Sequence, residues 1–377
     1  MADLHTGYVV DCDSHVMEPP DLWERYLEPR FRDRAIRIVT DPADGLEVLM
    51  IDKRPVLKGV LAGLGGANLP RQSVFIPGQT RYLDGCPPAS YEPAERIRLL
   101  DQWGVDAGVL FPTVGILWDV ADAELALAYA RAYNKWVNDF AAHDRSRIIP
   151  IAHLALHDPD EALRELRRCL KLGFKGVFLA PETVGGKRFS DYSFDPIWRE
   201  CEQAGIPVCL HVIVRLGRAQ AMLGNFYQPS EFRAVFGFAL GGFAQIVPAM
   251  MTMVLDGLFD RFERLKVLCV EAGCGWAPYV MDRMDQKYEH LGWTFPLKLK
   301  PSEYLRRNVW MVAEPEERTI ANVMDLMGED HVLWGSDYPH IDSTLEAPRL
   351  IRESAARLAP TRARKLMGEN ARRLFPS

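Results

Sequence analysis

The chain has 377 residues, of which 48% are hydrophobic and 25% are charged, and its formal net charge is -6. This is ordinary globular composition, and the chain is long enough to bury a core without disulfide or metal staples. The mild charge, without a long run of one sign, argues against a nucleic-acid surface, and no apolar stretch approaches the roughly 18 residues of a membrane span. The first residues lack a basic region followed by an apolar core, so we expect no signal peptide.

The cysteines are seven in number and irregularly spaced. Cys12, Cys209 and Cys269 lie inside apolar, strand-like runs. We interpret the cysteines as buried free thiols and expect a cytoplasmic protein. Cys269 and Cys274 come nearest to a metal-binding pair, but their spacing is not that of a zinc knuckle.

Short apolar runs that read as buried strands alternate along the chain with amphipathic helical patterns. The eight predicted strands are Tyr8–Asp13, Ala107–Pro112, Ile148–Leu154, Gly176–Ala180, Val208–Val212, Val267–Glu271, Val309–Ala313 and Val332–Ser336. The predicted helices span about 92–104, 122–143, 158–172, 194–204, 243–262, 276–291, 315–327 and 345–358. Such alternation is typical of a parallel sheet, and eight strands close a (β/α)8 barrel. We therefore predict an α/β fold, a (β/α)8 TIM barrel, with residues 1–377 forming a single domain.

Two segments interrupt this repeat. Residues 16–91 are rich in Pro and Gly, and an alternating pattern near Leu46–Leu57 predicts a hairpin there. Residues 213–242 follow the fifth predicted strand and are apolar and aromatic, and we predict a loop insertion there. Both segments emerge at the C-terminal ends of strands, where barrels carry their chemistry, so we interpret them as caps over a pocket. An oligomer interface is the alternative interpretation of both.

Several predicted strands end in a histidine or a carboxylate. Asp13 and His15 end the first strand region, His211 lies at the end of the fifth, Glu271 ends the sixth, and Asp337 follows the eighth. Because strand C-termini meet at the mouth of a barrel, we expect these side chains to converge on one site. Asp13 and His15 can both face the mouth, since alternate residues of a strand point the same way.

The same segments resemble the amidohydrolase superfamily, in its amidohydrolase-related or ACMSD-like branch, which includes metal-dependent nonoxidative decarboxylases. The resemblance rests on Asp11-Cys12-Asp13-Ser14-His15, Ala132-Tyr133-Asn134-Lys135-Trp136, Leu172-Gly173-Phe174-Lys175-Gly176-Val177, Glu271-Ala272-Gly273-Cys274-Gly275-Trp276, Gly335-Ser336-Asp337-Tyr338-Pro339-His340 and Gly368-Glu369-Asn370-Ala371. It covers nearly the whole chain and follows the order of the predicted strands. The family contains many reactions, so the resemblance does not identify the substrate.

The resemblance implies a divalent metal, one or two ions per chain, with zinc, manganese and iron as the candidates. It implies that Asp13, His15 and His211 are ligands, and that Asp337 binds metal or acts as an acid/base. Glu271 departs from the family pattern, because many relatives carry a general acid/base histidine there. Glu271 is therefore interpreted in three ways: as a proton-transfer group, as a metal ligand or as the partner of an arginine. One zinc ion needs about three protein ligands, so the surplus permits a dinuclear site.

Further side chains near the predicted mouth each have two interpretations. Arg215 grips a substrate carboxylate or is a surface charge. His340 orients a metal ligand or is an ordinary loop residue. His153 lines the mouth or lies in the core, and Trp118 and Tyr338 either stack on a planar substrate or simply pack.

The predicted function is metal-assisted hydrolysis or nonoxidative decarboxylation of a small organic acid or amide. The first alternative is a dinuclear non-haem iron or manganese oxygenase component on the same barrel. Because no flavin or NAD fingerprint is present, its redox partner would be a separate protein. The second alternative is a non-catalytic barrel subunit. By resemblance we expect a homodimer or a hetero-oligomer with a related chain, and we expect neither a nucleic-acid nor a membrane partner.

Overall fold

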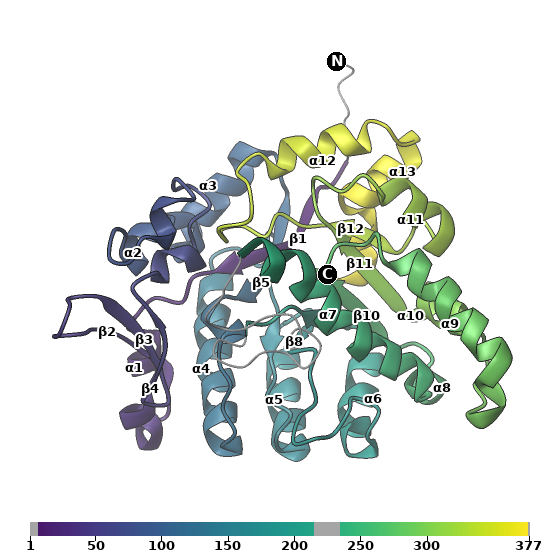
Figure 1. Ribbon diagram of the computed structural model, residues 1–377, viewed down its shortest axis with the longest axis horizontal. Helices are drawn as coiled ribbons and strands as arrows, with labels where there is room; N and C mark the ends of the chain where they lie inside the picture. The colour runs from purple at the N-terminus through teal and green to yellow at the C-terminus, as the bar shows by residue number, and fades with distance from the viewer. Residues whose placement is uncertain (1–6, 215–233, 376–377) are drawn as a thin grey trace.

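Short parallel strands form the centre of the molecule in the computed structural model, which describes residues 7–214 and 234–375 (Figure 1). These strands are β1 (Val10–Val16), β5 (Ala107–Pro112), β6 (Ile148–Pro150), β7 (Ala152–His153), β8 (Val177–Leu179), β9 (Pro207–His211), β10 (Lys266–Val270), β11 (Val309–Ala313) and β12 (Val332–Trp334). Nearly all of their residues are buried, as expected for strands covered on both faces. They coincide with the eight predicted strands, because β6 and β7 together occupy one of them.

Backbone hydrogen bonds connect the strands into a closed barrel. The strand order is β1-β5-β6 in one sheet and β12-β11-β10-β9-β8-β7 in the other. Ile151 joins β6 to β7, and its N–H donates to the carbonyl of Leu110 at 3.3 Å, so β6 and β7 form one strand that exchanges neighbours. At the other junction, the N–H of His15 donates to the carbonyl of Tyr338 at 2.6 Å, and the N–H of Asp337 donates to the carbonyl of Asp13 at 2.8 Å. The (β/α)8 TIM barrel is therefore confirmed.

Helices cover the outside of the barrel and follow the strands in order (Figure 1). They are α3 (Pro93–Trp103), α4 (Ala123–Ala141), α5 (Pro159–Lys171), α6 (Asp195–Ala204), α7 (Ala234–Leu255), α8 (Leu258–Arg261), α9 (Ala277–Leu291), α10 (Pro301–Asn308), α11 (Ile320–Met327), α12 (Ala347–Ala355), α13 (Pro360–Arg364) and α14 (Asn370–Leu374). Asp158 caps α5, with its carboxylate accepting the N–H groups of Asp160 and Glu161. Within the described ranges, no helix has the length and apolar character needed to cross a membrane.

The predicted insertions differ in how much structure they show. Residues 16–91 contain α1 (Leu22–Tyr26), α2 (Tyr82–Gly85) and an antiparallel sheet of β2 (Arg37–Thr40), β3 (Glu47–Ile51) and β4 (Arg54–Lys58). The predicted hairpin is confirmed, with Asp52 and Lys53 in its turn at φ of 49° and 62°.

The second insertion is partly helical, which corrects the predicted loop. The helix α7 begins at Ala234, inside the segment predicted as 213–242, because the apolar run there continues without a break into the predicted helix. The predicted helix over 243–262 is divided at Gly257, whose φ of 72° ends α7 and precedes α8. Residues 215–233, which include the predicted site residue Arg215, lie outside the described part of the chain.

Candidate metal centre

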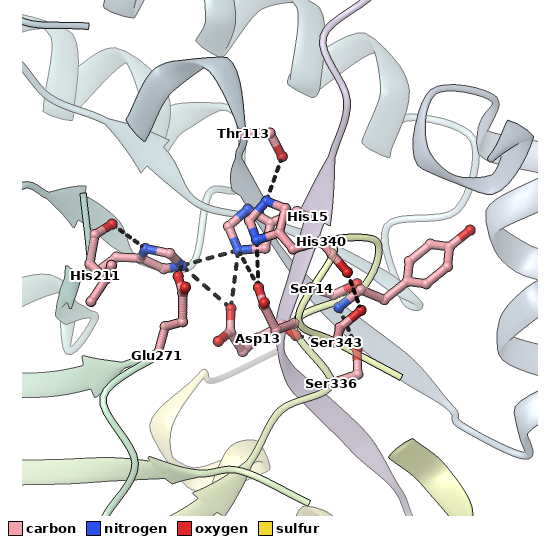
Figure 2. A network of polar contacts seen from close by, with 12 residues as sticks. Asp13, Ser14, His15, Thr113, His211, Glu271, Ser336, His340 and Ser343 are labelled. Atoms are coloured by element: carbon pink, nitrogen blue, oxygen red, sulfur yellow. Dashed lines mark hydrogen bonds and ion pairs between the residues drawn. The ribbon is translucent and has the colours of Figure 1, made fainter. Parts of the chain in front are cut away.

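Two buried imidazoles face each other at the mouth of the barrel (Figure 2). The Nε2 atoms of His15, on β1, and His211, at the end of β9, lie 3.1 Å apart. The Nδ1 atom of His15 lies 2.9 Å from the carbonyl oxygen of Pro112, and that of His211 lies 2.8 Å from the carbonyl oxygen of Val212. Because a carbonyl only accepts, each Nδ1 must donate, and each neutral ring then turns an Nε2 lone pair toward the other. Burial, together with nearby His340, lowers the pKa of His15 to about 3, which keeps its ring neutral.

Three carboxylates surround the Nε2 atoms of His15 and His211. Asp13 Oδ1 lies 3.3 Å from His15 Nε2 and 3.5 Å from His211 Nε2. Asp337 Oδ1 lies 3.4 Å from His15 Nε2, and Glu271 Oε2 lies 3.5 Å from His211 Nε2. Within the described part of the chain, Asp13 Oδ1 and Glu271 Oε2 are buried and accept no hydrogen bond. Lone pairs and carboxylate oxygens that face one another are a costly arrangement unless protons or a cation lie among them.

The donor atoms fit a divalent cation. Ligand atoms at about 2.1 Å from one ion lie about 3.0–3.4 Å from their neighbours in octahedral or tetrahedral geometry. The separations of 3.1–3.5 Å among Asp13, His15, His211, Glu271 and Asp337 agree with this spacing. Imidazole and carboxylate donors without thiolate suit zinc, manganese or iron. The structure thus brings together the five side chains that the sequence predicts to converge. They form two overlapping groups that could hold an ion: Asp13, His15 and His211 in one, and His15, Glu271, Asp337 and His340 in the other.

The carboxylates of the cluster differ in charge. Although burial alone would raise it, contact with His15 and His211 holds the pKa of Asp13 below its ordinary value. Burial raises the pKa of Glu271 and Asp337 well above the ordinary range, and neighbouring carboxylates, including Asp342, raise both further. Without a cation, the protonated forms of Glu271 and Asp337 are therefore favoured. A divalent cation held by Asp337 would displace the proton of that side chain.

The backbone is strained where the two outer carboxylates stand. Glu271 follows β10 with φ of 57°, and Asp337 follows β12 with φ of 54°. Both are in the left-handed region, which costs a residue other than glycine about 1–2 kcal/mol. Beside them, Gly335 allows the close approach of β12 to β1, because a Cβ atom at this position would overlap the side chain of Asp13. Strain at carboxylates that face a cation-sized gap is typical of functional sites.

His340 contacts the cluster from the loop after β12. Its Nδ1 lies 2.7 Å from Asp337 Oδ1, and its Nε2 lies 3.1 Å from Thr113 Oγ1 (Figure 2). Its ring centroid lies 3.9 Å from that of His15. His340 is thus a buried neighbour of two candidate ligands, which favours the interpretation that it orients a ligand.

The predicted aromatic residues lie in two different places. Trp118 and His153 line a pocket at the C-terminal ends of β5, β7 and β8, and their ring centroids are 4.3 Å apart. This placement favours a position at the mouth for both. The ring of Tyr338 instead packs against Trp103 at 5.3 Å and under the guanidinium of Arg96 at 5.2 Å. Tyr338 is therefore placed for packing and not for stacking on a substrate.

The sequence analysis missed several groups around the cluster. Buried Glu18 accepts the N–H groups of Val114 at 2.8 Å and Gly115 at 3.2 Å, which fixes the turn after β5. Burial raises the pKa of Glu18 to about 7, although these bonds oppose the shift. Glu314 and Asp342 act on Glu271 through their charges. Glu314 directly follows β11, so the strand-end signal that identified Glu271 also applied to it.

Comparisons with known proteins agree with this geometry. The model of the amidohydrolase family matches residues 10–377. The chain is 28% identical over 286 residues to the 2-amino-3-carboxymuconate-6-semialdehyde decarboxylase of Dictyostelium discoideum, covering 74% of this chain and 76% of the relative. It is 26% identical over 286 residues to the gamma-resorcylate decarboxylase of Rhizobium radiobacter, covering 72% and 85%. These names confirm the leading prediction of an enzyme in the hydrolase or carboxy-lyase class.

Solved structures show the same fold over the whole length. An amidohydrolase from Mycobacterium avium subsp. paratuberculosis K-10 superposes with a TM-score of 0.80 at 25% identity, covering 98% of this chain and 99% of that one. The 5-carboxyvanillate decarboxylase of Novosphingobium aromaticivorans, solved with bound manganese, superposes with a TM-score of 0.72 at 20% identity, covering 99% and 98%. With the family match over residues 10–377, we conclude that the chain belongs to the amidohydrolase family.

Proposed function

We propose that the chain is a nonoxidative decarboxylase that uses one divalent cation to act on a small aromatic or unsaturated carboxylic acid. The observation that carries the proposal is the convergence of two imidazole Nε2 atoms and three carboxylate oxygens at 3.1–3.5 Å. The decarboxylases among the relatives support the choice of reaction. Manganese in the related carboxyvanillate enzyme makes that metal a first candidate beside zinc and iron.

We assign the ligand roles from the geometry. His15 and His211 would hold the cation through Nε2, and Asp13 and Asp337 would hold it through Oδ1. A cation held there would supply a Lewis acid that withdraws charge from the substrate carboxylate. His340 would keep Asp337 oriented, because its Nδ1 and Nε2 are fixed between Asp337 and Thr113.

Glu271 is the proposed proton donor. Burial and the neighbouring carboxylates raise its pKa, which favours a protonated side chain that can donate. The Glu271 carboxyl gives this proton to the carbon that carries the substrate carboxylate. The bond between that carbon and the carboxylate then breaks, its electron pair returns to the unsaturated system, and CO2 leaves. Glu271 regains a proton from solvent, so the reaction consumes one proton for each CO2 released.

The proposal also includes a role for the first insertion and a compartment for the protein. Residues 16–91 would act as part of the cap, since Glu18 holds the turn at Val114 and Gly115 beside the site. All seven cysteines are free and buried, which supports a reducing compartment such as the cytoplasm. The single-domain organisation and an oligomer of this chain or with a related one stay predictions.

The reaction can be tested with product analysis in heavy water. Protein purified without chelator would be loaded with one equivalent of Mn2+ or Zn2+ and incubated with hydroxybenzoates, carboxylated methoxyphenols and the matching amides. We expect CO2 in equal amount to the decarboxylated product, with one deuterium at the carbon that lost the carboxylate. Chelator treatment should abolish the release.

Other outcomes would identify the alternatives. Hydrolysis of the amides without CO2 would replace the proposal with a hydrolase, because the same cation can activate water. Consumption of O2 only after an electron donor is added would favour the oxygenase. Full metal loading with no turnover on any substrate class would favour the non-catalytic subunit.

A further inference from the structure

A buried arginine lies directly behind the candidate metal centre. Arg96, on α3, is 1% exposed, and among the described residues it is the only Lys or Arg whose side chain is buried. Among the described residues Arg96 forms no ion pair, although the charge of Asp11 acts on it from a longer distance. Burying a guanidinium without a carboxylate is costly, so its hydrogen-bond partners must replace its water shell.

The guanidinium of Arg96 joins three segments that are distant in the sequence. Its Nε donates to the carbonyl of Ala89 at 2.7 Å, in the insertion that follows β1. Its Nη1 donates to Ser14 Oγ at 2.5 Å, and its Nη2 donates to the carbonyl of His15, both on β1. The guanidinium carbon of Arg96 also lies 5.2 Å from the ring centroid of Tyr338, in the loop after β12. One planar group thus holds the insertion, the first strand and the last loop together.

These contacts fix the backbone on both sides of a candidate ligand. The carbonyl of His15 accepts from Arg96, while the N–H of His15 donates to the carbonyl of Tyr338 at 2.6 Å. Tyr338 is the residue next to Asp337, whose carboxylate lies 3.4 Å from the His15 imidazole. Arg96 thus contacts the backbone of His15 and the side-chain ring of Tyr338, so it connects the segments that carry the two candidate ligands.

We infer that Arg96 is a positioning residue that sets the distance between His15 and Asp337 and so the affinity of the centre for its cation. The inference rests on the proposed function, because it requires a cation at these two side chains. A lysine cannot take over this role fully, since it lacks the planar fork that reaches Ser14 and the His15 carbonyl together.

The test compares metal affinity in Arg96→Met, Arg96→Lys and a matched control. Arg352→Met is the control, because Arg352 also donates to backbone carbonyls of the α3 end, at Trp103 (2.9 Å) and Gly104 (2.7 Å), but bonds to no residue of the centre. Affinity would be measured on metal-free, full-length protein by competition of Mn2+ or Zn2+ with a chromophoric chelator. The absorption spectrum of the Co2+-loaded protein would report the ligand geometry, and thermal unfolding would report stability.

We expect Arg96→Met to weaken metal binding by about 10–100-fold, the usual effect of losing a group that orients a ligand. Arg96→Lys should lie between this variant and the wild type, and the cobalt spectrum should change in both. Arg352→Met should lower Tm and leave affinity and spectrum unchanged. If Arg96→Met does not fold, Ser14→Ala removes one partner of Arg96 and should weaken binding several-fold with a changed spectrum.

Two results would overturn the inference in distinguishable ways. Wild-type affinity in a folded Arg96→Met or Ser14→Ala protein, or equal losses in Arg96→Met and Arg352→Met, would leave the metal centre intact and remove the role of Arg96. A wild-type protein that binds none of the three metals would instead overturn the proposed function, and the inference with it.

Discussion

The centre has an imidazole half, His15 and His211, and a carboxylate half, Glu271 and Asp337. The two halves differ in burial and in backbone conformation. His15 and His211 are completely buried, and each ring is fixed by a bond from Nδ1 to a backbone carbonyl. Glu271 and Asp337 stand beyond the strand ends, with side chains 17% and 16% exposed and backbones in the left-handed region. The histidines are thus prepared to bind before any cation arrives. The outer carboxylates concentrate strain and mutual repulsion, and they are the partly exposed members of the cluster.

This difference assigns separate tasks to the two halves. A rigid neutral pair of Nε2 atoms fixes where a cation sits, while strained carboxylates with raised pKa values can exchange protons. If the interpretation is right, substitution of His15 or His211 should abolish metal binding. Substitution of Glu271 should leave metal binding intact and abolish turnover.

Removal of one imidazole is expected to have the largest effect. His211→Ala deletes an Nε2 that faces His15, Asp13 and Glu271, so we expect elemental analysis to find almost no bound metal and activity to fall to background. His331→Ala is the matched control, because its Nδ1 also lies 2.9 Å from a strand carbonyl, that of Val309, while its ring stacks on Trp310. Full metal occupancy in His211→Ala would contradict the assignment of this half as the binding half.

Glu271→Gln should separate chemistry from binding. Glutamine keeps the shape of the side chain but cannot give and regain the proton, so turnover should fall by about 10²–10⁴-fold. Metal content should stay near that of the wild type, because His15, His211, Asp13 and Asp337 remain. Asp337→Asn should lower both turnover and metal content. Loss of metal in Glu271→Gln would make Glu271 a necessary ligand and return a dinuclear centre to consideration.

The fold and much of the centre could be predicted because both depend on local patterns. Apolar runs locate the buried strands, and the meeting of strand C-termini at a barrel mouth predicts the convergence of Asp13, His15, His211, Glu271 and Asp337. The start of α7 was missed because its aromatic, apolar residues suit a cap as well as a helix.

The supporting groups could not be predicted in the same way. Arg96 lies in an amphipathic helix, where a charged residue normally faces solvent, and only the folded chain brings it to Ser14 and His15. Glu18 likewise acts on backbone N–H groups that are distant in sequence, at Val114 and Gly115. Such contacts carry no periodic signal, and they become readable only from tertiary structure.

Metal binding should become stronger as pH rises. In the metal-free protein the pKa values of Glu271 and Asp337 are raised above their values of about 4 in an unfolded chain. Stability from these groups is therefore full below about pH 4 and is lost as pH rises, because the unfolded chain gives up its protons first. A cation held by Asp337 displaces the proton of that side chain, so affinity should rise by up to about tenfold per pH unit for that one proton.

The difference in Tm between loaded and metal-free protein measures this linkage. We expect it to widen from pH 5 to pH 8. Glu18 and Asp11, whose pKa values burial raises to about 7, titrate outside the ligand set and should affect both forms alike. A Tm difference that is constant over this range would mean that the carboxylate half binds the cation without releasing protons.

The smallest effect should come from relieving strain in the carboxylate half. Glu271→Asn removes a carboxylate from the cluster and places at φ of 57° a residue that tolerates the left-handed region. We expect the metal-free variant to be more stable than the wild type by about 1–2 kcal/mol in chemical denaturation, the usual range for one strained residue. The metal-loaded variant should lose turnover, so stability and activity move in opposite directions.

Lys53→Gly supplies the matched control for strain alone. Lys53 occupies the β3–β4 turn at φ of 62°, away from the centre, so glycine there should give a smaller gain that is equal with and without metal. The gain of Glu271→Asn should instead be larger without metal, because the variant then also removes the cost of keeping a buried carboxyl protonated among other carboxylates. Equal gains in both forms would show that relief of backbone strain alone accounts for the effect of Glu271→Asn.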